Sequence, residues 1–238
     1  MRKTEWYMRF QPFFRFPWRK AGGVLLALLL LSSTGRADDW DKYLADNGFV
    51  NVQTLDSTIK VYLFYATPFN FTGKAVYQGL TKAWLHPDAA KKLVKAQKAL
   101  KKEHPEYSLI VYDAARPVAI QRMMWDLVKG TPRDYYVTNP SNGGGRHNYG
   151  MAVDVTVTDS LGRSIPMGTP FDYFGETANT DQEEDLLKTG KITRDEYKNR
   201  LLLRKVMREA GFTTITSEWW HFNACSSSVA KAKYKLIE

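Results

Sequence analysis

The sequence of 238 residues is poor in cysteine and histidine, with one cysteine and four histidines. A single cysteine, Cys225, excludes an intrachain disulfide and any zinc site built from several cysteines. We interpret Cys225 as a small apolar residue near the C-terminus. Any metal site in this chain must therefore use histidine and carboxylate ligands.

Long apolar runs, internal repeats and low-complexity segments are also missing. The longest apolar run covers residues 21–31, which is short of the roughly 20 residues that span a membrane. A basic stretch precedes this run, and small and polar residues follow it up to Ala37. This order is typical of a secretory signal. We expect residues 1–37 to be a signal peptide, with an uncleaved anchor as the alternative because its basic part is long and aromatic.

The formal net charge of +9 is concentrated in the signal segment, which holds seven basic residues and one acidic residue. The remaining chain carries only +3, an ordinary balance that does not favour nucleic-acid binding. Once the signal is cleaved, we expect no stable membrane insertion. The predicted location is therefore the periplasm or the cell envelope.

Residues 38–238 are long enough for one domain, and a hydrophobic content of 44% predicts a packed core. Hydrophobic periodicity predicts helices over 87–103, 118–128 and 193–210, and strands over 59–65, 107–112, 151–157 and 212–220. The segment 176–191 is polar and is expected to be a mobile excursion. Because helices fall irregularly between strands, we predict an α+β domain with a largely antiparallel central sheet flanked by helices.

The stretch from Gly145 to Asp154 carries the strongest chemical signal. Asp154 stands in the apolar run 151–157, where a carboxylate is costly unless it is paired or bound to a metal. His147 precedes it, and Glu218 and His221 follow later in the chain. A catalytic zinc ion usually has three protein ligands and one open position. His147, Asp154 and His221 form such a set for one Zn²⁺, and Glu218 is left over as a proton acceptor.

Arg116 lies where the predicted strand 107–112 ends and Pro117 begins a helix. Its guanidinium could stabilise the oxyanion that forms at a carbonyl. The alternative is a structural ion pair with Asp113 or Asp126. Taken with the zinc set, Arg116 favours metal-assisted hydrolysis of an amide or ester.

The sequence resembles the D-alanyl-D-alanine dipeptidases, zinc peptidases related to D,D-carboxypeptidases and to the hedgehog domain. The family motif is Ser-x-His-x-x-Gly-x-Ala-x-Asp followed by Glu-x-Trp-His, and residues 145–154 and 218–221 are similar to it. Segments 65–74, 113–117 and 166–172 also look like dipeptidase segments. The resemblance therefore covers most of residues 61–222.

The resemblance implies a hedgehog-like or D,D-peptidase-like fold and a D-Ala-D-Ala substrate. It implies His147, Asp154 and His221 as zinc ligands, with Glu218 as general base and acid. It also implies that Arg116 stabilises the transition state, and it makes Tyr65 and Asp172 candidate substrate-binding residues. Asp172 would pair with the free ammonium group of the dipeptide.

One position departs from the family, because Gly145 stands where a serine is usual. A hydroxyl expected near the substrate is therefore missing from the motif. The alternative functions are a D,D-carboxypeptidase or endopeptidase that acts on peptidoglycan stem peptides, and a zinc-containing binding domain without activity.

Overall fold

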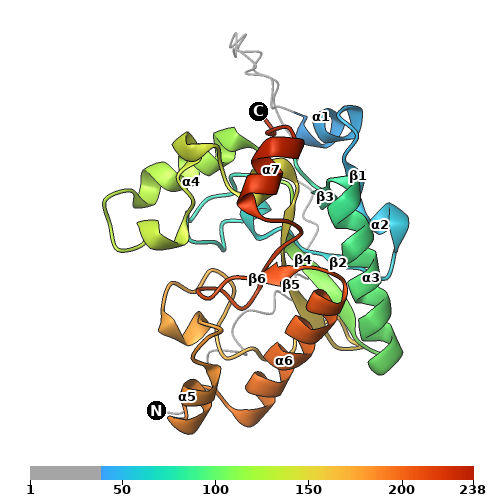
Figure 1. The fold of residues 1–238 in the computed structure, drawn as a ribbon, viewed down its shortest axis with the longest axis vertical. Helices are drawn as coiled ribbons and strands as arrows, with labels where there is room; N and C mark the ends of the chain where they lie inside the picture. The colour runs from blue at the N-terminus through green and yellow to red at the C-terminus, as the bar shows by residue number, and fades with distance from the viewer. Residues whose placement is uncertain (1–38) are drawn as a thin grey trace, which may run out of the picture. The chain divides into compact units, whose positions relative to one another are not determined.

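The computed structural model describes residues 39–238 (Figure 1). The predicted signal peptide lies outside the described residues and stays a prediction. The helices are α1 (Trp40–Asp46), α2 (Val52–Leu55), α3 (Pro87–Glu103), α4 (Val118–Val128), α5 (Glu183–Lys188), α6 (Arg194–Glu209) and α7 (Ser227–Lys233). The strands are β1 (Val50–Asn51), β2 (Lys60–Val61), β3 (Trp84–Leu85), β4 (Ser108–Asp113), β5 (Ala152–Thr158), β6 (Thr213–Thr214) and β7 (His221–Asn223). None of the helices within this part of the chain combines the length and apolar composition that a membrane crossing requires.

The central sheet has five strands in the order β2-β4-β5-β7-β6. Only the pair β2–β4 is parallel, while β4–β5, β5–β7 and β6–β7 are antiparallel. The short strands β1 and β3 form a separate antiparallel pair. The prediction of an α+β fold with a largely antiparallel sheet is confirmed.

Strand β5 lies in the middle of the sheet, and all seven of its residues are buried. Successive side chains of a strand point to opposite faces. Val153, Val155 and Val157 therefore share one face and belong to the hydrophobic core, whereas Asp154 and Thr156 share the other. A polar residue on a strand buried on both faces needs a partner in the protein, and Asp154 has one in the site described below.

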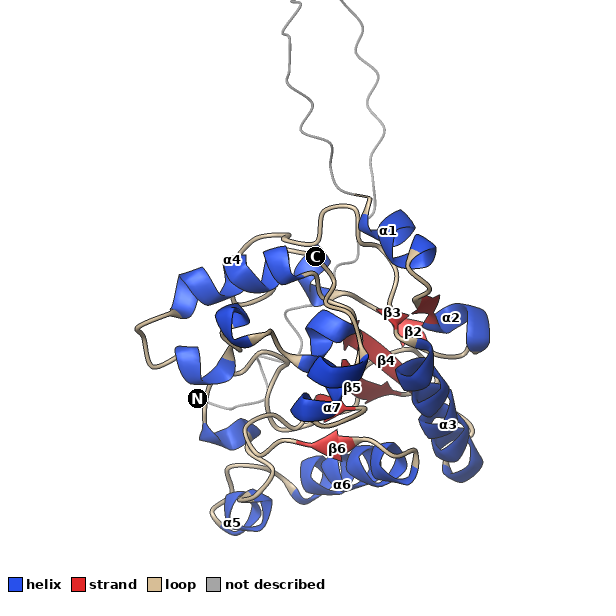
Figure 2. Cartoon of the chain, turned by 45° about the horizontal axis from the view of Figure 1, so that its top comes forward, coloured by secondary structure: helices blue, strands red, loops and turns tan. Residues whose placement is uncertain are grey.

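Helices α3 and α6 pack side by side and cover the same side of the sheet (Figures 1 and 2). The predicted bounds of α3 are confirmed, with Pro87 at its first position. Its apolar stripe includes Leu93 and Leu100, both completely buried. Burying a leucine side chain stabilises a fold by roughly 1.5–3 kcal/mol. The stripe therefore holds α3 on the core and leaves its lysines outside.

Helix α6 begins with the predicted capping box, in which Thr193 and Glu196 each accept a hydrogen bond from the backbone N–H of the other. Not all leucines of α6 face the core. Leu203 and Met207 are buried, while Leu201 is 41% exposed.

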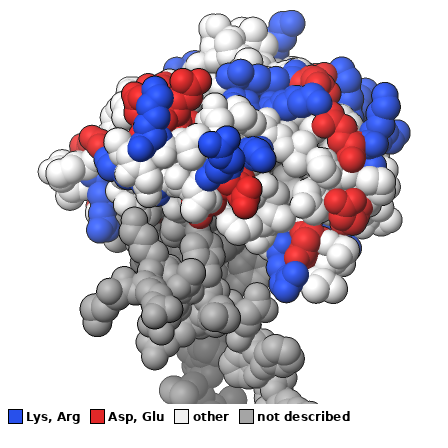
Figure 3. All heavy atoms as spheres, turned by 90° about the horizontal axis from the view of Figure 1, so that it is seen from below, with Lys and Arg blue, Asp and Glu red and all other residues white. Residues whose placement is uncertain are grey.

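Lys205 of α6 forms an ion pair with Glu103 of α3, with an N–O distance of 2.6 Å. Basic and acidic side chains lie next to one another on the face of the molecule shown in Figure 3.

Two predicted strands are shorter in the structure. In segment 59–65 only β2 is a strand, because the chain then turns through a 3₁₀ helix, η2 (Phe64–Ala66). The side-chain amide of Asn70 donates to the carbonyl oxygens of Phe64, Thr67 and Lys74 and holds this turn. In segment 212–220 only β6 is a strand, and Glu218 lies in the turn between β6 and β7. The prediction that one continuous strand carries Glu218 is wrong.

The polar segment 176–191, predicted to be a mobile excursion, contains two regular elements, the 3₁₀ helix η6 (Glu176–Ala178) and helix α5. Glu183 of α5 is only 4% exposed and forms ion pairs with Arg200 and Arg204 of α6. These pairs attach α5 to α6. The sequence shows the charges of this segment but not that one of its acids is buried.

Candidate active site

The three predicted metal ligands come from three neighbouring elements. His147 lies in a 3₁₀ helix, η5 (Arg146–Tyr149), immediately before β5. Asp154 lies in β5, and His221 is the first residue of β7. Asp154 and His221 are directly opposite each other in the antiparallel pair β5–β7. Directly opposite residues point to the same face of a sheet, so strand register brings these two side chains together.

Gly150 allows His147 to reach them. It ends η5 with a φ of 63°, in the left-handed region that other residues rarely adopt. A Cβ atom at this position would also lie 2.5 Å from the Phe49 ring and 2.9 Å from the backbone nitrogen of His86. Only glycine fits this turn, which takes the chain from the histidine into β5.

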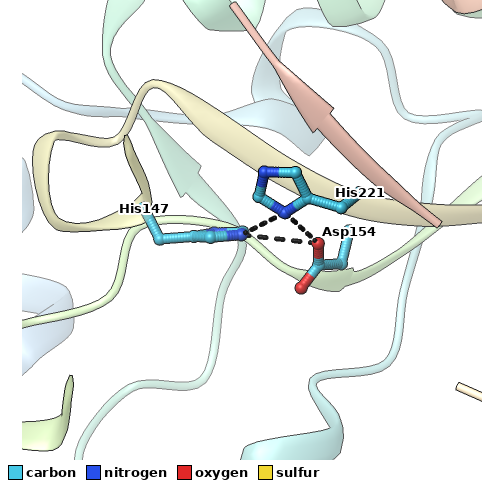
Figure 4. A group of neighbouring side chains, drawn as sticks. All are labelled: His147, Asp154 and His221. Carbon is cyan, nitrogen blue, oxygen red and sulfur yellow. Dashed lines mark hydrogen bonds and ion pairs between the residues drawn. The ribbon is translucent and has the colours of Figure 1, made fainter. Parts of the chain in front are cut away.

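The side chains of His147, Asp154 and His221 point toward one another (Figure 4). His147 Nε2 lies 3.2 Å from His221 Nδ1 and 3.4 Å from Asp154 Oδ1. His221 Nδ1 lies 2.9 Å from the same Asp154 oxygen. Ligands placed tetrahedrally around zinc at bond lengths of about 2.0–2.1 Å are about 3.3 Å apart. The spacing of the three atoms therefore fits a zinc ion.

The outer nitrogen of each histidine has a partner that fixes the tautomer. His147 Nδ1 donates to the carbonyl oxygen of Ala114 at 2.7 Å, and His221 Nε2 donates to Asn223 Oδ1 at 2.8 Å. The inner nitrogens then carry lone pairs that face each other and the Asp154 carboxylate. Three acceptors that face one another need a cation or extra protons between them. Histidines that bind a metal typically donate a hydrogen bond from the outer nitrogen, as both histidines do here. The donor set thus suits a divalent metal.

The Asp154 carboxylate is stabilised in its charged form. Burial alone would raise its pKa, but the nearby His147 and His221 lower it below the ordinary range through charge and hydrogen bonds. An ionised carboxylate is the form that binds a metal. Asp154 is therefore ready to act as a ligand at neutral pH.

Glu218 lies beside this cluster without belonging to it. Its Oε2 is 4.0 Å from His221 Nδ1, and its side chain is 14% exposed. Burial raises the pKa of its carboxyl to about 7, although the charge of His221 opposes the shift. A group with a pKa near the working pH can both accept and return a proton. A cation at the three ligands would favour its ionised form.

Arg116 lies on the same side of the sheet because strand β4 contains a bulge. The register of β4 against β5 shifts between Val111 and Asp113, so that Asp113 pairs with Asp154. The shift moves Asp113 from the face of Val111, which is in the core, to the face of Asp154. The buried Asp113 carboxylate then accepts from Arg116 Nε at 3.0 Å and from Nη2.

The structure shows the ion pair of Arg116, while its role at a developing oxyanion stays a prediction. Arg116 forms the predicted ion pair with Asp113 and none with Asp126 among the described residues. Its guanidinium is nevertheless part of the cavity wall, with Nη2 4.0 Å from Asp154 Oδ2. Burial would lower its pKa, but Asp113 raises it well above the ordinary value, so the guanidinium stays charged. Asp113 holds a cation that still faces the site.

The two predicted substrate-binding residues, Tyr65 and Asp172, contact each other. The Tyr65 hydroxyl donates to Asp172 Oδ1 at 2.8 Å, while Asp172 Oδ2 is buried without a hydrogen-bond partner in the described chain. Asp172 has a φ of 59°, a strained conformation for a residue other than glycine. Burial raises the pKa of its carboxyl to about 7, although the bond from Tyr65 lowers it. A strained acid with an unpaired buried oxygen indicates a binding site for a cationic group.

These residues line one cavity of about 180 Å³. Three rings from separate segments of the chain line one part of it, and we call them the aromatic wall (Phe71, Tyr136 and Phe174). Tyr136 stacks on Phe174 with ring centroids 5.0 Å apart, and Phe71 lies 5.2 Å from Phe174. The wall and Asp172 also line a neighbouring depression, so the wall separates the two spaces. The cavity is smaller than the roughly 300–1,000 Å³ of drug-sized sites and suits a small ligand.

Three supporting residues have no role assigned from the sequence. Tyr77 donates to Asp113, Gln121 Oε1 accepts from Arg116 Nη1 at 2.9 Å, and Asn223 accepts from both His221 and Arg146. Two of them leave a trace in the sequence. Gln121 is a polar residue on the buried face of α4, and Asn223 follows His221 by two positions, so both point to the same face of β7. Tyr77 leaves no such trace.

Comparison with known proteins agrees with this geometry. The chain is 33% identical over 173 residues to a D-alanyl-D-alanine dipeptidase of Escherichia coli (strain K12), covering 73% of this chain and 82% of that protein. It is 29% identical over 180 residues to one of Enterococcus faecium, covering 66% and 82%, and 26% identical over 200 residues to one of Enterococcus faecalis, covering 74% and 91%. The family model described as D-ala-D-ala dipeptidase, Peptidase_M15, matches residues 45–237. The protein therefore belongs to this family of peptidases.

Proposed function

We propose that the protein is an exported zinc dipeptidase that hydrolyses D-Ala-D-Ala in the cell envelope, in peptidoglycan turnover or recovery of D-alanine. The observation that carries this proposal is one small cavity lined both by the His-Asp-His set and by Asp172, whose Oδ2 has no hydrogen-bond partner in the described chain. Family membership supports dipeptide hydrolysis, and the three dipeptidases above are similar over most of the chain. The predicted signal at residues 1–37 supports export.

One Zn²⁺ ion would be held by His147 Nε2, Asp154 Oδ1 and His221 Nδ1. Bound there, it would supply Lewis acidity, which makes water a stronger nucleophile at neutral pH. Asn223 and the Ala114 carbonyl fix both imidazoles, so the ligand atoms are already oriented. The remaining chemistry belongs to side chains of the chain itself.

The dipeptide is oriented by its charged ends. Its ammonium group pairs with Asp172, whose Oδ2 has no hydrogen-bond partner within residues 39–238 and whose Oδ1 accepts from Tyr65. This pairing requires a free amino group one residue before the scissile bond. The aromatic wall lies between the cavity and the neighbouring depression and limits how far a longer chain could extend, so the site favours a dipeptide over a stem peptide.

The attacking water gives a proton to Glu218 while the water oxygen forms a bond to the carbonyl carbon of the substrate. Arg116 donates to the carbonyl oxygen as negative charge develops there. Glu218 then returns the proton to the amide nitrogen, the C–N bond breaks, and two D-alanine molecules leave. A carboxyl with a pKa near 7 suits this double role, and a fixed buried guanidinium suits an oxyanion.

The test compares hydrolysis of D-Ala-D-Ala and of a pentapeptide stem by purified residues 38–238 loaded with zinc. We expect turnover of the dipeptide, its loss with a chelator, and its recovery when zinc is restored. Faster turnover of the pentapeptide would instead identify a D,D-carboxypeptidase or endopeptidase. Bound metal without turnover of either peptide would identify a binding domain.

A variant separates catalysis from metal binding. Glu218→Ala removes the proton acceptor without removing a ligand, so the rate should fall on the order of 10²–10⁴-fold while zinc content stays at one per chain. Undiminished hydrolysis by this variant would contradict the assigned mechanism. Glu176→Ala, which removes an exposed acid elsewhere, serves as the control.

A further inference from the structure

The backbone conformation of Gly145 does not require glycine at this position. Its φ of −92° and ψ of 175° are extended and open to any residue. A Cβ atom there would instead lie 3.2 Å from Thr138 Oγ1 and 3.4 Å from Thr138 Cβ. A side chain at position 145 would therefore crowd the side chain of Thr138, which would have to give way by a few tenths of an ångström.

Thr138 is held close to the reacting groups. Its carbonyl oxygen accepts from Gln121 Nε2 at 2.8 Å, and the other end of the same amide accepts from Arg116. Both Thr138 and Gly145 line the cavity. The Thr138 hydroxyl forms no hydrogen bond with any residue of the described chain, so it is available to a ligand.

The charges of the cavity indicate which end of a dipeptide this hydroxyl meets. Asp172 and Glu218 supply the negative charge outside the metal ligands, and Asp172 suits the ammonium group. Arg116 and Arg146 supply the positive charge, and both also line the cavity. Thr138 is linked to Arg116 through Gln121, and Arg146 follows Gly145 in the chain. The hydroxyl therefore lies on the cationic side, where a carboxylate is favoured.

We propose that Thr138 is a substrate-binding residue whose hydroxyl donates a hydrogen bond to the carboxylate of the dipeptide, in place of a side chain at position 145. The inference rests on the proposed dipeptidase function and names a contact of the same site. It explains how a chain with glycine at position 145 keeps a hydroxyl in the cavity. A threonine at 138 and a larger residue at 145 would compete for one space.

The first test is Thr138→Val, which keeps the shape of the side chain and removes the hydroxyl. A hydrogen bond to a charged group accounts for roughly 10–100-fold in binding. We expect KM for D-Ala-D-Ala to rise by that factor, with kcat changed less than about twofold. Thr138→Ser keeps a hydroxyl and should stay near the wild type. Ser217→Ala removes another hydroxyl from the cavity lining and is the matched control.

The second test asks which substrate group is bound. D-Ala-D-alaninamide lacks the carboxylate, so Thr138→Val should raise its KM much less than that of the free dipeptide. An equal rise for both substrates would overturn the assignment to the carboxylate. A rise with Ser217→Ala and none with Thr138→Val would overturn the role of Thr138.

The third test moves the hydroxyl. Thr138→Ala should raise KM, and Thr138→Ala combined with Gly145→Ser should lower it again, because the serine enters the vacated space. Failure of the serine to recover any binding would contradict the exchange between positions 138 and 145. If the wild type itself does not hydrolyse D-Ala-D-Ala, the proposed function fails and this inference fails with it. Wild-type turnover that Thr138→Val leaves unchanged defeats this inference alone.

Discussion

The ligand side and the substrate side of the cavity rest on different kinds of backbone. Asp154 and His221 are in register on neighbouring strands, and Asp113 continues the row on β4. Asp172, Phe71 and Phe174 come from loops and Tyr136 from a short 3₁₀ helix (Asp134–Tyr136), and Asp172 has a left-handed backbone conformation. The ligand side is thus placed by backbone hydrogen bonds of the sheet, and the substrate side by contacts between side chains.

This difference teaches how such a site divides its tasks. A metal needs three atoms held within a few tenths of an ångström, which two rigid strands and the short 3₁₀ helix directly before β5 provide. Substrate choice needs a wall whose shape depends on a few rings in loops, which can change without moving the sheet. Changes on the ligand side should therefore abolish activity, and changes on the substrate side should shift specificity.

The largest effect is expected from Asp154→Ala. The variant removes the only carboxylate among the candidate ligands and leaves two facing imidazoles. We expect zinc content to fall well below one per chain and hydrolysis of D-Ala-D-Ala to fall to background. Metal analysis and a rate assay measure the two effects. Full zinc content with full activity would show that the row of strand residues is not the metal site.

Asn223→Ala should act on the ligand side without removing a ligand. Asn223 is buried and accepts the hydrogen bond that orients His221. Loss of such a partner typically weakens metal binding by about 10–100-fold. Competition with a chelator measures the affinity. Asn199→Ala is the control. Asn199 donates a hydrogen bond to the carbonyl oxygen of Pro166 and bonds none of the candidate ligands, so this variant should bind zinc normally.

Asp172→Asn should weaken binding of the dipeptide by roughly 10–100-fold, because the charged partner of the ammonium group is lost. The same change should stabilise the metal-free protein at neutral pH. Burial raises the folded pKa of Asp172 to about 7, above its value in the unfolded chain. Ionising this carboxyl thus costs stability as pH rises from about 4 to 7.

Thermal unfolding of the two metal-free proteins tests this sign. The melting temperature of Asp172→Asn should exceed that of the wild type at pH 8, and the difference should shrink toward pH 4. A difference that grows as the pH falls would contradict the assignment. Kinetics of the zinc-loaded proteins report the loss of substrate binding separately.

Phe174→Ala should have the smallest effect, a change in selectivity. Phe174 contacts both Tyr136 and Phe71, so its removal opens the aromatic wall between the cavity and the neighbouring depression. We expect the ratio of pentapeptide to dipeptide turnover to rise about tenfold, in line with the effect of one pocket side chain. Tyr62→Ala, which removes an exposed ring that lines neither the cavity nor the depression, should leave the ratio unchanged. An unchanged ratio for Phe174→Ala would show that the wall does not exclude longer chains.

Much of this fold could be predicted because local patterns were clear. The bounds of α3 and α4 follow from an apolar stripe and a proline before or at each start, and the capping box of α6 follows from Thr193 and Glu196. Short elements were less predictable. Segment 212–220 is apolar enough for a strand, yet most of it forms the turn that carries Glu218.

The candidate ligands could also be predicted, because few histidines are present and an acid in an apolar strand requires a partner. The supporting residues could not. Asp113 reaches the site only through a bulge in β4, Asn223 also accepts from the distant Arg146, and Gln121 also donates to the carbonyl of Thr138. A bulge depends on the pairing of two strands, and no local pattern reports it.

The sequence by itself determined which donor groups are available, where the long helices begin and end, and to which family the chain belongs. Tertiary structure alone decided that Asp154 meets His221, that Arg116 faces the cavity while bound to Asp113, and that Thr138 fills the space beside Gly145. The physical reason is the separation along the chain over which each interaction acts. Helix periodicity and capping act within a few residues, whereas strand register and loop packing depend on groups that only the folded chain brings together.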